Sequence, residues 1–240
     1  MTARISTAIG VAVLAVAGAA AGDGVGADLP RGRQAVELDP ADFETHIDNR
    51  YWPMRRGSRW LYRGSGDGVK ARSRVRVTGR TKMLANGVRA RALQDAAREK
   101  GRLVEVAFEW YAQDQAGNVW YLAEDVMEPR RGKLRHTQGW EAGVDGAQPG
   151  VVMPGAPEVG MRYRQQHYRR KNADRSEILS LEERVKVPAG QFNDVLMLRE
   201  TTPVEPRAAE YKFYAPGVGL VLTQEVSGGK ARLELARHVR

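Results

Sequence analysis

Residues 69–77 are Val69-Lys70-Ala71-Arg72-Ser73-Arg74-Val75-Arg76-Val77, a run in which small or apolar residues alternate with basic ones. Successive side chains of a β-strand point to opposite faces, so this pattern predicts a strand with one apolar face and one basic face. Leu103–Ala112 repeats the alternation, with Val104, Val106, Phe108, Trp110 and Ala112 on one face and Glu105 and Glu109 opposite. Together the two stretches indicate a β-protein.

The same alternation extends outward over most of the chain. Further strands are predicted at residues 88–96, 118–124, 177–187, 209–214, 218–226 and 230–239. Turn residues such as Asn86-Gly87 and Asp114–Gly117 separate the strands and suit hairpins. No convincing helical pattern follows residue 50. We therefore expect an all-β single domain over residues 51–240, built as a curved antiparallel sheet or an open (half) β-barrel.

The N-terminal residues 1–27 have the pattern of an export signal. Arg4 precedes an apolar run that continues to Ala21, small residues follow, and the run is too short to anchor in a bilayer. We expect this signal peptide to be cleaved, leaving a periplasmic or secreted protein with no transmembrane segment. In the N-terminal segment 28–50, Asp39-Pro40-Ala41-Asp42 predicts a short helix that runs to about Ile47.

Composition excludes several classes of function. The 240 residues contain no cysteine, which excludes disulfides, zinc–thiolate sites, iron–sulfur clusters and thiol nucleophiles. No nucleophile elbow, zinc-protease motif or phosphate-binding glycine loop occurs. Glu44, His46 and Asp48 could converge on a metal only from an extended strand, whereas the preceding residues favour a helix. We predict no catalytic residue, no metal site and no cofactor.

The formal net charge of +9 requires either a partner or a local explanation. If the strands 69–77 and 88–96 pair, one face carries five arginines: Arg72, Arg74, Arg76, Arg89 and Arg91. A third strand at 103–112 would then place Glu105 and Glu109 on that face as cross-strand ion pairs. Because this would neutralise the face, and because exported proteins rarely meet nucleic acid, we predict no nucleic-acid partner.

The unpaired excess of positive charge concentrates in residues 130–135 and 162–175. We therefore consider an anionic envelope polymer or lipid headgroups as partners of these stretches, against the alternative of an ordinary solvated loop surface. The candidate contact residues are Arg130, Arg131, Arg169 and Arg170.

Residues 138–160 hold six Gly and three Pro and predict a long loop, of the kind that is usually functional or mobile. Trp140 lies among these glycines and is the first candidate for an aromatic that contacts a ligand, the alternative being a plug over the open end of the barrel. Acidic and aromatic residues cluster in and beside the loop, which gives five candidate ligand-binding residues: Trp120, Glu124, Trp140, Glu141 and Asp145. The same acids could serve a glycoside hydrolase as acid and base, or simply pair with arginines.

Several phrases resemble a family of exported bacterial proteins of unknown function. The most specific are Gly57-Ser58-Arg59-Trp60-Leu61-Tyr62 and Trp110-Tyr111-Ala112-Gln113-Asp114 followed by Gly117-Asn118-Val119-Trp120-Tyr121. Asp48-Asn49-Arg50-Tyr51-Trp52-Pro53-Met54 belongs to the same set. The phrases Val187–Phe192 and Tyr214–Val221 are similar to those of lipoprotein-carrier-like open β-barrels. This second resemblance implies a curved sheet with a concave apolar face and supplies no catalytic residue.

These observations favour a non-enzymatic exported module that holds an apolar or amphipathic cell-envelope ligand on its concave face. A carboxylate-dependent hydrolase of an envelope polysaccharide and a polyanion-binding surface protein remain the alternatives.

Overall fold

The computed structural model describes residues 29–66, 68–168, 173–203 and 205–240, so the expected signal peptide 1–27 lies outside the described residues. The described residues form one antiparallel sheet, which confirms the all-β prediction. Its strands are β1 (Phe43–Glu44), β2 (Arg59–Gly66), β3 (Val69–Met83), β4 (Arg89–Glu99), β5 (Arg102–Asp114), β6 (Val119–Arg130), β7 (Lys133–Glu141), β8 (Gln148–Met153), β9 (Arg162–Arg164), β10 (Gln166–His167), β11 (Arg175–Val187), β12 (Gly190–Thr201), β13 (Ala209–Ala215), β14 (Gly219–Ser227) and β15 (Arg232–Val239). In the described part of the chain, no helix is long and apolar enough to cross a membrane.

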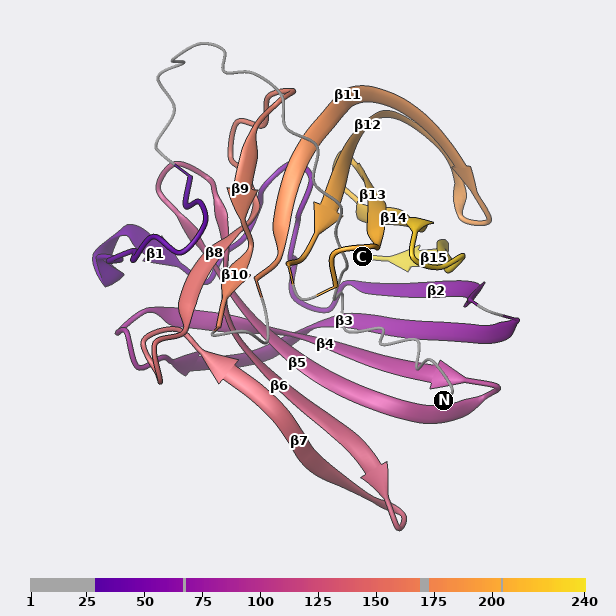
Figure 1. Cartoon of the computed structure of the whole chain (residues 1–240), viewed down its shortest axis with the longest axis horizontal. Helices are drawn as coiled ribbons and strands as arrows, with labels where there is room; N and C mark the ends of the chain where they lie inside the picture. Colours follow the sequence, from indigo (N-terminus) through magenta and orange to yellow (C-terminus); the bar gives the residue numbers. More distant parts are fainter. Residues whose placement is uncertain (1–28, 67, 169–172, 204) are drawn as a thin grey trace.

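The sheet curls into a nearly closed barrel (Figure 1). The strand order is β10-β8-β6-β5-β4-β3-β2-β15-β14-β13-β12-β11-β9, while β1 adds to β5 and β7 adds to β6. Its two ends are neighbours in sequence, since β9 pairs with β11 and β10 pairs with β8. One short segment, Arg162–His167, therefore brings the two edges of the sheet together.

The alternation in residues 69–77 separates the interior from the exterior. Ala71, Ser73 and Val77 of β3 are buried, whereas Arg72 and Arg74 are exposed. A one-residue shift in register would reverse every side chain, so the buried face fixes the pairing of β3 with β2 and β4.

An Arg164-centred strap covers the seam of the barrel on its outer side. The Arg164 side chain is buried and donates hydrogen bonds to the carbonyl oxygens of Gly32 (3.1 Å), Gln34 (2.7 Å) and Pro149 (2.9 Å). Its backbone N–H donates to the Pro30 carbonyl at 2.7 Å. The segment 30–34 is thus fixed to both β8 and β9, across the junction between the two edges.

The short helix predicted from Asp39 is a single 3-10 turn, Pro40–Asp42, and does not reach Ile47. The Asp39 side chain caps it as expected, accepting a hydrogen bond from the Ala41 N–H at 2.9 Å. Phe43 is already extended, pairs with Asp114 and packs its ring edge-on against Trp120. Tertiary packing of Phe43 therefore ends the helix.

The prediction of one long loop over residues 138–160 is wrong. The β7 strand continues to Glu141, a tight turn follows, and β8 begins at Gln148. Gly150 lies in β8, where a Cβ atom would come within 2.2 Å of the Arg164 carbonyl oxygen, closer than two non-bonded atoms can approach. High glycine content here reflects close backbone packing in a strand rather than a free loop.

Residues 46–54 cross one end of the barrel as a plug. Asn49 is buried, and its Oδ1 accepts hydrogen bonds from the N–H groups of Tyr51 (2.9 Å) and Trp52 (3.1 Å). This turn directs the Trp52 ring between Tyr111 and Tyr214, at centroid distances of 5.4 and 5.6 Å. An aromatic plug does exist, and it is Trp52 rather than Trp140.

Candidate functional site in the barrel interior

Three carboxyl side chains lie on the inner faces of adjacent strands. Glu109 of β5 is the register partner of buried Leu93 on β4 and of Glu124 on β6. Asp95 lies two residues beyond Leu93, on the same face of β4. All three carboxyls are almost completely buried, with exposed fractions of 4% for Glu109 and 9% each for Asp95 and Glu124.

The predicted ion pairs between the arginines of β3 and the glutamates of β5 are therefore wrong. Ala97 and Leu93 are the partners of Glu105 and Glu109, and both are buried. Arg74 pairs instead with Ala96, on the opposite face of β4. The glutamates of β5 and the arginines of β3 therefore lie on opposite faces of the sheet. Alternation within a strand fixes which of its residues share a face, but the pairing register decides which face of one strand continues into which face of the next.

A second acidic group lies on the inner faces of β12 and β13. Glu200 pairs with Glu210 in register, and the Lys212 ammonium lies 2.6 Å from Glu200 and 3.2 Å from Glu210. Gln165 donates a hydrogen bond to Glu200, and Gln166 donates one to the buried carboxyl of Asp174. Among the described residues, Lys212 is the basic side chain that makes ion pairs with this group.

Burial and mutual repulsion make these carboxyls weak acids. Burial first, then the charges of Glu124 and Asp95, raises the pKa of Glu109 to about 8. Burial, with Glu105 adding to it, raises the pKa of Glu124 to about 7, and burial raises the pKa of Asp95 to about 6.

The second group shows the same trend, although a cation is present. Burial raises the pKa of Asp174 to about 6 and that of Glu210 to about 7, although Lys212 opposes both shifts. Burial alone would lower the pKa of the Lys212 ammonium, but Glu200 and Glu210 outweigh it and raise that pKa. The interior can therefore hold several protons near neutral pH.

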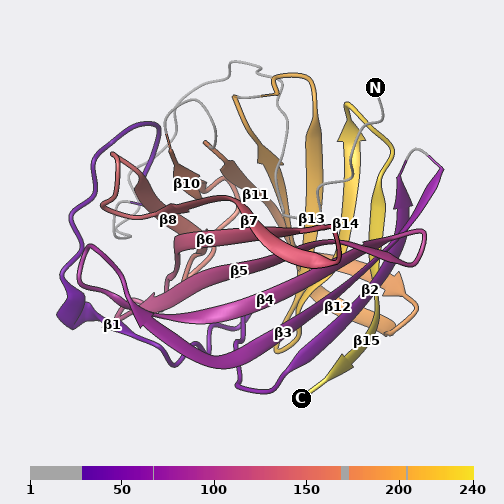
Figure 2. The same ribbon diagram turned by 90° about the horizontal axis from the view of Figure 1, so that it is seen from below.

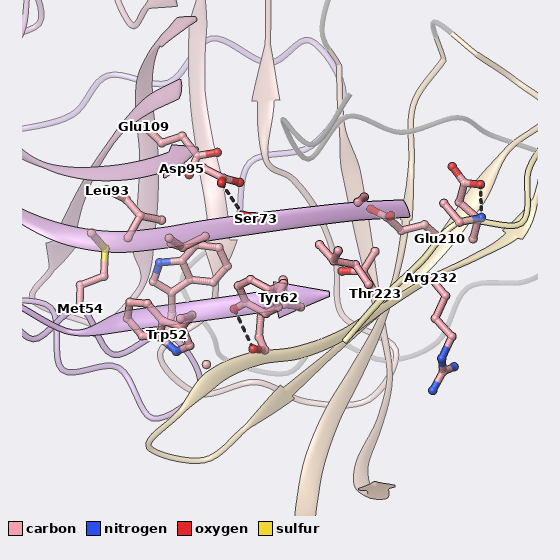
Figure 3. Close-up of a pocket in the computed structure, with 18 of the residues that line it drawn as sticks. Trp52, Met54, Tyr62, Ser73, Leu93, Asp95, Glu109, Glu210, Thr223 and Arg232 are labelled. Atoms are coloured by element: carbon pink, nitrogen blue, oxygen red, sulfur yellow. Dashed lines mark hydrogen bonds between the residues drawn. The ribbon is translucent and has the colours of Figure 1, made fainter. Parts of the chain in front are cut away.

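A cavity of about 130 Å³ is lined by residues of both acidic groups (Figure 3). Aromatic and aliphatic side chains form much of its lining, including Trp52, Met54, Trp60, Tyr62, Leu93 and Leu233. The carboxyls of Asp95, Glu109 and Glu210 also line it, together with Ser73 and Thr223. Ser73 donates a hydrogen bond to Asp95, and Tyr111 donates one to Glu109 at 3.1 Å. The cavity thus combines an apolar body with several oxygen acceptors.

Two of the five predicted ligand-binding residues lie together on the inner face. Glu124 and Trp140 are register partners, and the Trp140 ring packs edge-on against Tyr121 at 5.0 Å. The Trp140 indole N–H is buried and has no hydrogen-bond partner within the described part of the chain. Trp120 is buried on the outer face of β6, where its indole N–H donates to Asp114 at 2.7 Å and Phe43 packs edge-on against its ring.

The other two predicted residues lie away from Glu124. Glu141 is on the outer face, where its carboxylate accepts hydrogen bonds from Lys82 Nζ at 3.1 Å and from the Ala85 N–H at 2.7 Å. Asp145 is in the turn between β7 and β8 and has a positive φ of 51°. The structure does not bring Glu124, Glu141 and Asp145 together as an acid–base set.

The two basic stretches differ in their surroundings. Arg130 and Arg131 lie at the tip between β6 and β7, and Arg130 is 3.7 Å from Glu128. Arg169 and Arg170 fall outside the described residues. The run 162–175 is not a uniform charged surface, because Arg162 pairs with Glu177 at 2.7 Å and Arg164 is buried in the strap.

Sequence reasoning missed Asp95, Glu210 and Lys212, although a signal for them existed. Each is a charged residue at a position where the period-two pattern expects an inward-facing side chain, as at Leu93 and Asp95. Charged residues in a strand are usually expected to face solvent, but these face the interior of the barrel. No group of three or more His, Asp or Glu residues in the described ranges is arranged to hold a metal ion.

Comparison with known proteins identifies fold-level similarity only. No family model matches the chain, and no curated protein matches it. A solved structure of a candidate lipoprotein from Parabacteroides distasonis ATCC 8503 is 13% identical, with 80% of this chain and 99% of that chain covered and a TM-score of 0.44. A candidate exported protein with a YmcC-like fold from Bacteroides fragilis NCTC 9343 is 14% identical, with 80% and 100% covered and a TM-score of 0.44. At this similarity neither match assigns a function to the chain.

Proposed function

We propose that this protein is an exported, non-enzymatic module that binds an amphipathic cell-envelope ligand in the barrel interior. The cavity beside Trp52, Trp60 and Tyr62, with Asp95 and Glu109 on its wall, is the observation that carries this proposal. The signal pattern of residues 1–27 supports export.

The chemistry of the wall favours a ligand with an apolar body and a protonated amine. Aromatic rings attract cations through their faces, and buried carboxylates gain most from a cationic partner. Lys212 already shows this arrangement, since its ammonium lies between Glu200 and Glu210.

A series of probes with one tail and three headgroups tests the proposal: octylamine, octanol and octanoate. We expect octylamine to bind best and octanoate worst, measured by titration calorimetry and by tryptophan fluorescence. Octylamine affinity should rise between pH 5 and pH 9, because Asp95 and Glu109 lose protons over that range while the amine keeps its charge. Equal binding of the three probes, or none, would contradict the proposal.

A matched pair of variants separates cavity binding from surface binding. Thr223→Trp fills the cavity from β14, whereas Val226→Trp adds the same ring to an exposed position of the same strand. We expect Thr223→Trp to weaken octylamine binding at least tenfold and Val226→Trp to leave it unchanged. Mass spectrometry of gently extracted protein should also find a co-purifying amphipathic molecule in the Val226→Trp variant and not in Thr223→Trp.

A further inference from the structure

The outer wall opposite this interior carries a dense array of arginines on β15, β2, β3 and β4. Figure 2 shows β2, β3 and β4 side by side across one wall of the barrel. The outward-facing arginines of this wall are defined here as the arginine face: Arg59, Arg63, Arg72, Arg74, Arg76, Arg98 and Arg237.

The pairing of the strands sets these cations directly opposite one another. Arg63 is the register partner of Arg72, which is in turn the partner of Arg98 on β4. Arg59 faces Arg76 in the same way. Like charges opposite each other on adjacent strands destabilise a sheet, so the free protein bears a cost that a bound anion would remove.

Protein acids do little to neutralise the arginine face. Glu105 and Glu109 point to the interior, and Glu234, the outward partner of Arg63, accepts two hydrogen bonds from Arg232. Within the described residues, none of the seven arginines of the face makes an ion pair. The separation of acids inside from bases outside therefore concentrates positive charge on this wall.

We propose that the arginine face docks on the surface of an anionic phospholipid bilayer. The array spreads over four adjacent strands, so it matches a two-dimensional layer of phosphates. Each guanidinium group can donate two parallel hydrogen bonds to the oxygens of one phosphate group. Single-stranded nucleic acid is usually held by exposed aromatic rings on which its bases stack. Phe108 of the neighbouring strand β5, the register partner of Gln94, is half-buried with Arg80 over its ring at 5.0 Å.

Vesicle flotation tests the docking surface. We expect the protein to bind vesicles of phosphatidylcholine with 30 mol% phosphatidylglycerol, chosen as a probe, and to release them as salt is raised. Arg72→Gln/Arg74→Gln should weaken binding by more than tenfold, since each basic residue near an anionic surface contributes roughly a fivefold gain. Circular dichroism checks that the variant is folded.

The matched control is Arg131→Gln/Arg135→Gln at the tip between β6 and β7, which removes the same charge from exposed positions. The sequence pattern names Arg131 as a candidate lipid contact, so this variant also decides between that stretch and the arginine face. We expect it to bind vesicles as the unmodified protein does. Equal losses in the two variants would overturn the arginine face in favour of diffuse net charge. Tighter binding to soluble polyphosphate than to the vesicles would overturn the bilayer as the occupant, and octylamine binding that is unchanged in Arg72→Gln/Arg74→Gln keeps this test separate from that of the interior.

Discussion

Glu109 shows how a single residue couples the interior of the barrel to pH. Its carboxyl is buried beside Glu124 and accepts a hydrogen bond from Tyr111. Burial raises the pKa from 4.5 to about 8, so between these values the folded protein holds a proton that the unfolded chain releases. Because the folded state binds more protons over this window, the free energy of unfolding falls as pH rises from about 4.5 to 8.

Replacing Glu109 with Gln should remove much of this pH dependence. We expect Glu109→Gln to raise the free energy of unfolding by roughly 5 kcal/mol at pH 8.5 and to change it little at pH 4.5, since the pKa rises from 4.5 to about 8 and each pKa unit corresponds to about 1.4 kcal/mol. Urea denaturation at the two pH values measures the difference. Glu182→Gln, at an exposed position of β11, is the control and should change neither value. A variant less stable than the parent at pH 8.5 would show that the ionised form of Glu109 is needed by the fold.

At the scale of elements, the strap is the device that holds the seam. β9 and β10 have only three and two residues, so their ladder hydrogen bonds contribute little to closing the barrel. Arg164 compensates by binding the carbonyls of Gly32, Gln34 and Pro149 from one guanidinium group. If these carbonyls move away, the buried guanidinium group loses its hydrogen-bond partners together, and a buried charged group without partners is costly.

We expect Arg164→Ala to release the segment 29–38 and to loosen β8 and β10. Loss of its charge-assisted hydrogen bonds should lower the free energy of unfolding by about 3 kcal/mol. Hydrogen exchange should speed up in β8 and β10, and a protease should cut in 29–38 first. Arg175→Ala, at an exposed position on the neighbouring strand, should leave both readouts unchanged. Unaltered protection of β8 in Arg164→Ala would show that the strap does not hold the seam.

At the scale of the whole molecule, the barrel joins residues 43–239 in one sheet. We propose that the described chain is a single cooperative domain. Tryptophan fluorescence and far-ultraviolet circular dichroism should then report one coincident urea transition, because Trp60 lies on β2 while Trp110, Trp120 and Trp140 lie on β5, β6 and β7. Two separated transitions would indicate that the two walls unfold independently.

The alternation of apolar and polar residues determines how much of the fold and of the candidate site the sequence predicts. Period two identified the class of fold and most strands, because it is local, as at Val69–Val77. It could not decide which face of Leu103–Ala112 is inside: the apolar Phe108 face lies outward and the Glu109 face inward. Trp140 and Glu124 are register partners, whereas the sequence pattern places Trp140 in a loop. Facing and closure depend on contacts between distant strands, and no single stretch of sequence contains them.

Within the described residues, the incomplete seam also leaves part of one strand without a neighbour on one side. β9 pairs with β11 at Arg175, Ser176 and Glu177, and the backbone of Gly160 and Met161 hydrogen-bonds Ile178, so the part of this long strand beyond Ile178 is the border of the sheet on its β9 side. A bare strand border is a template on which other chains add strands and from which amyloid can start. Glu182, Glu183, Arg184 and Lys186 place charges of both signs along this border, and two irregularities in its pairing with β12 bend it there. Solubility of the protein would then depend on a stretch that lies away from the interior cavity.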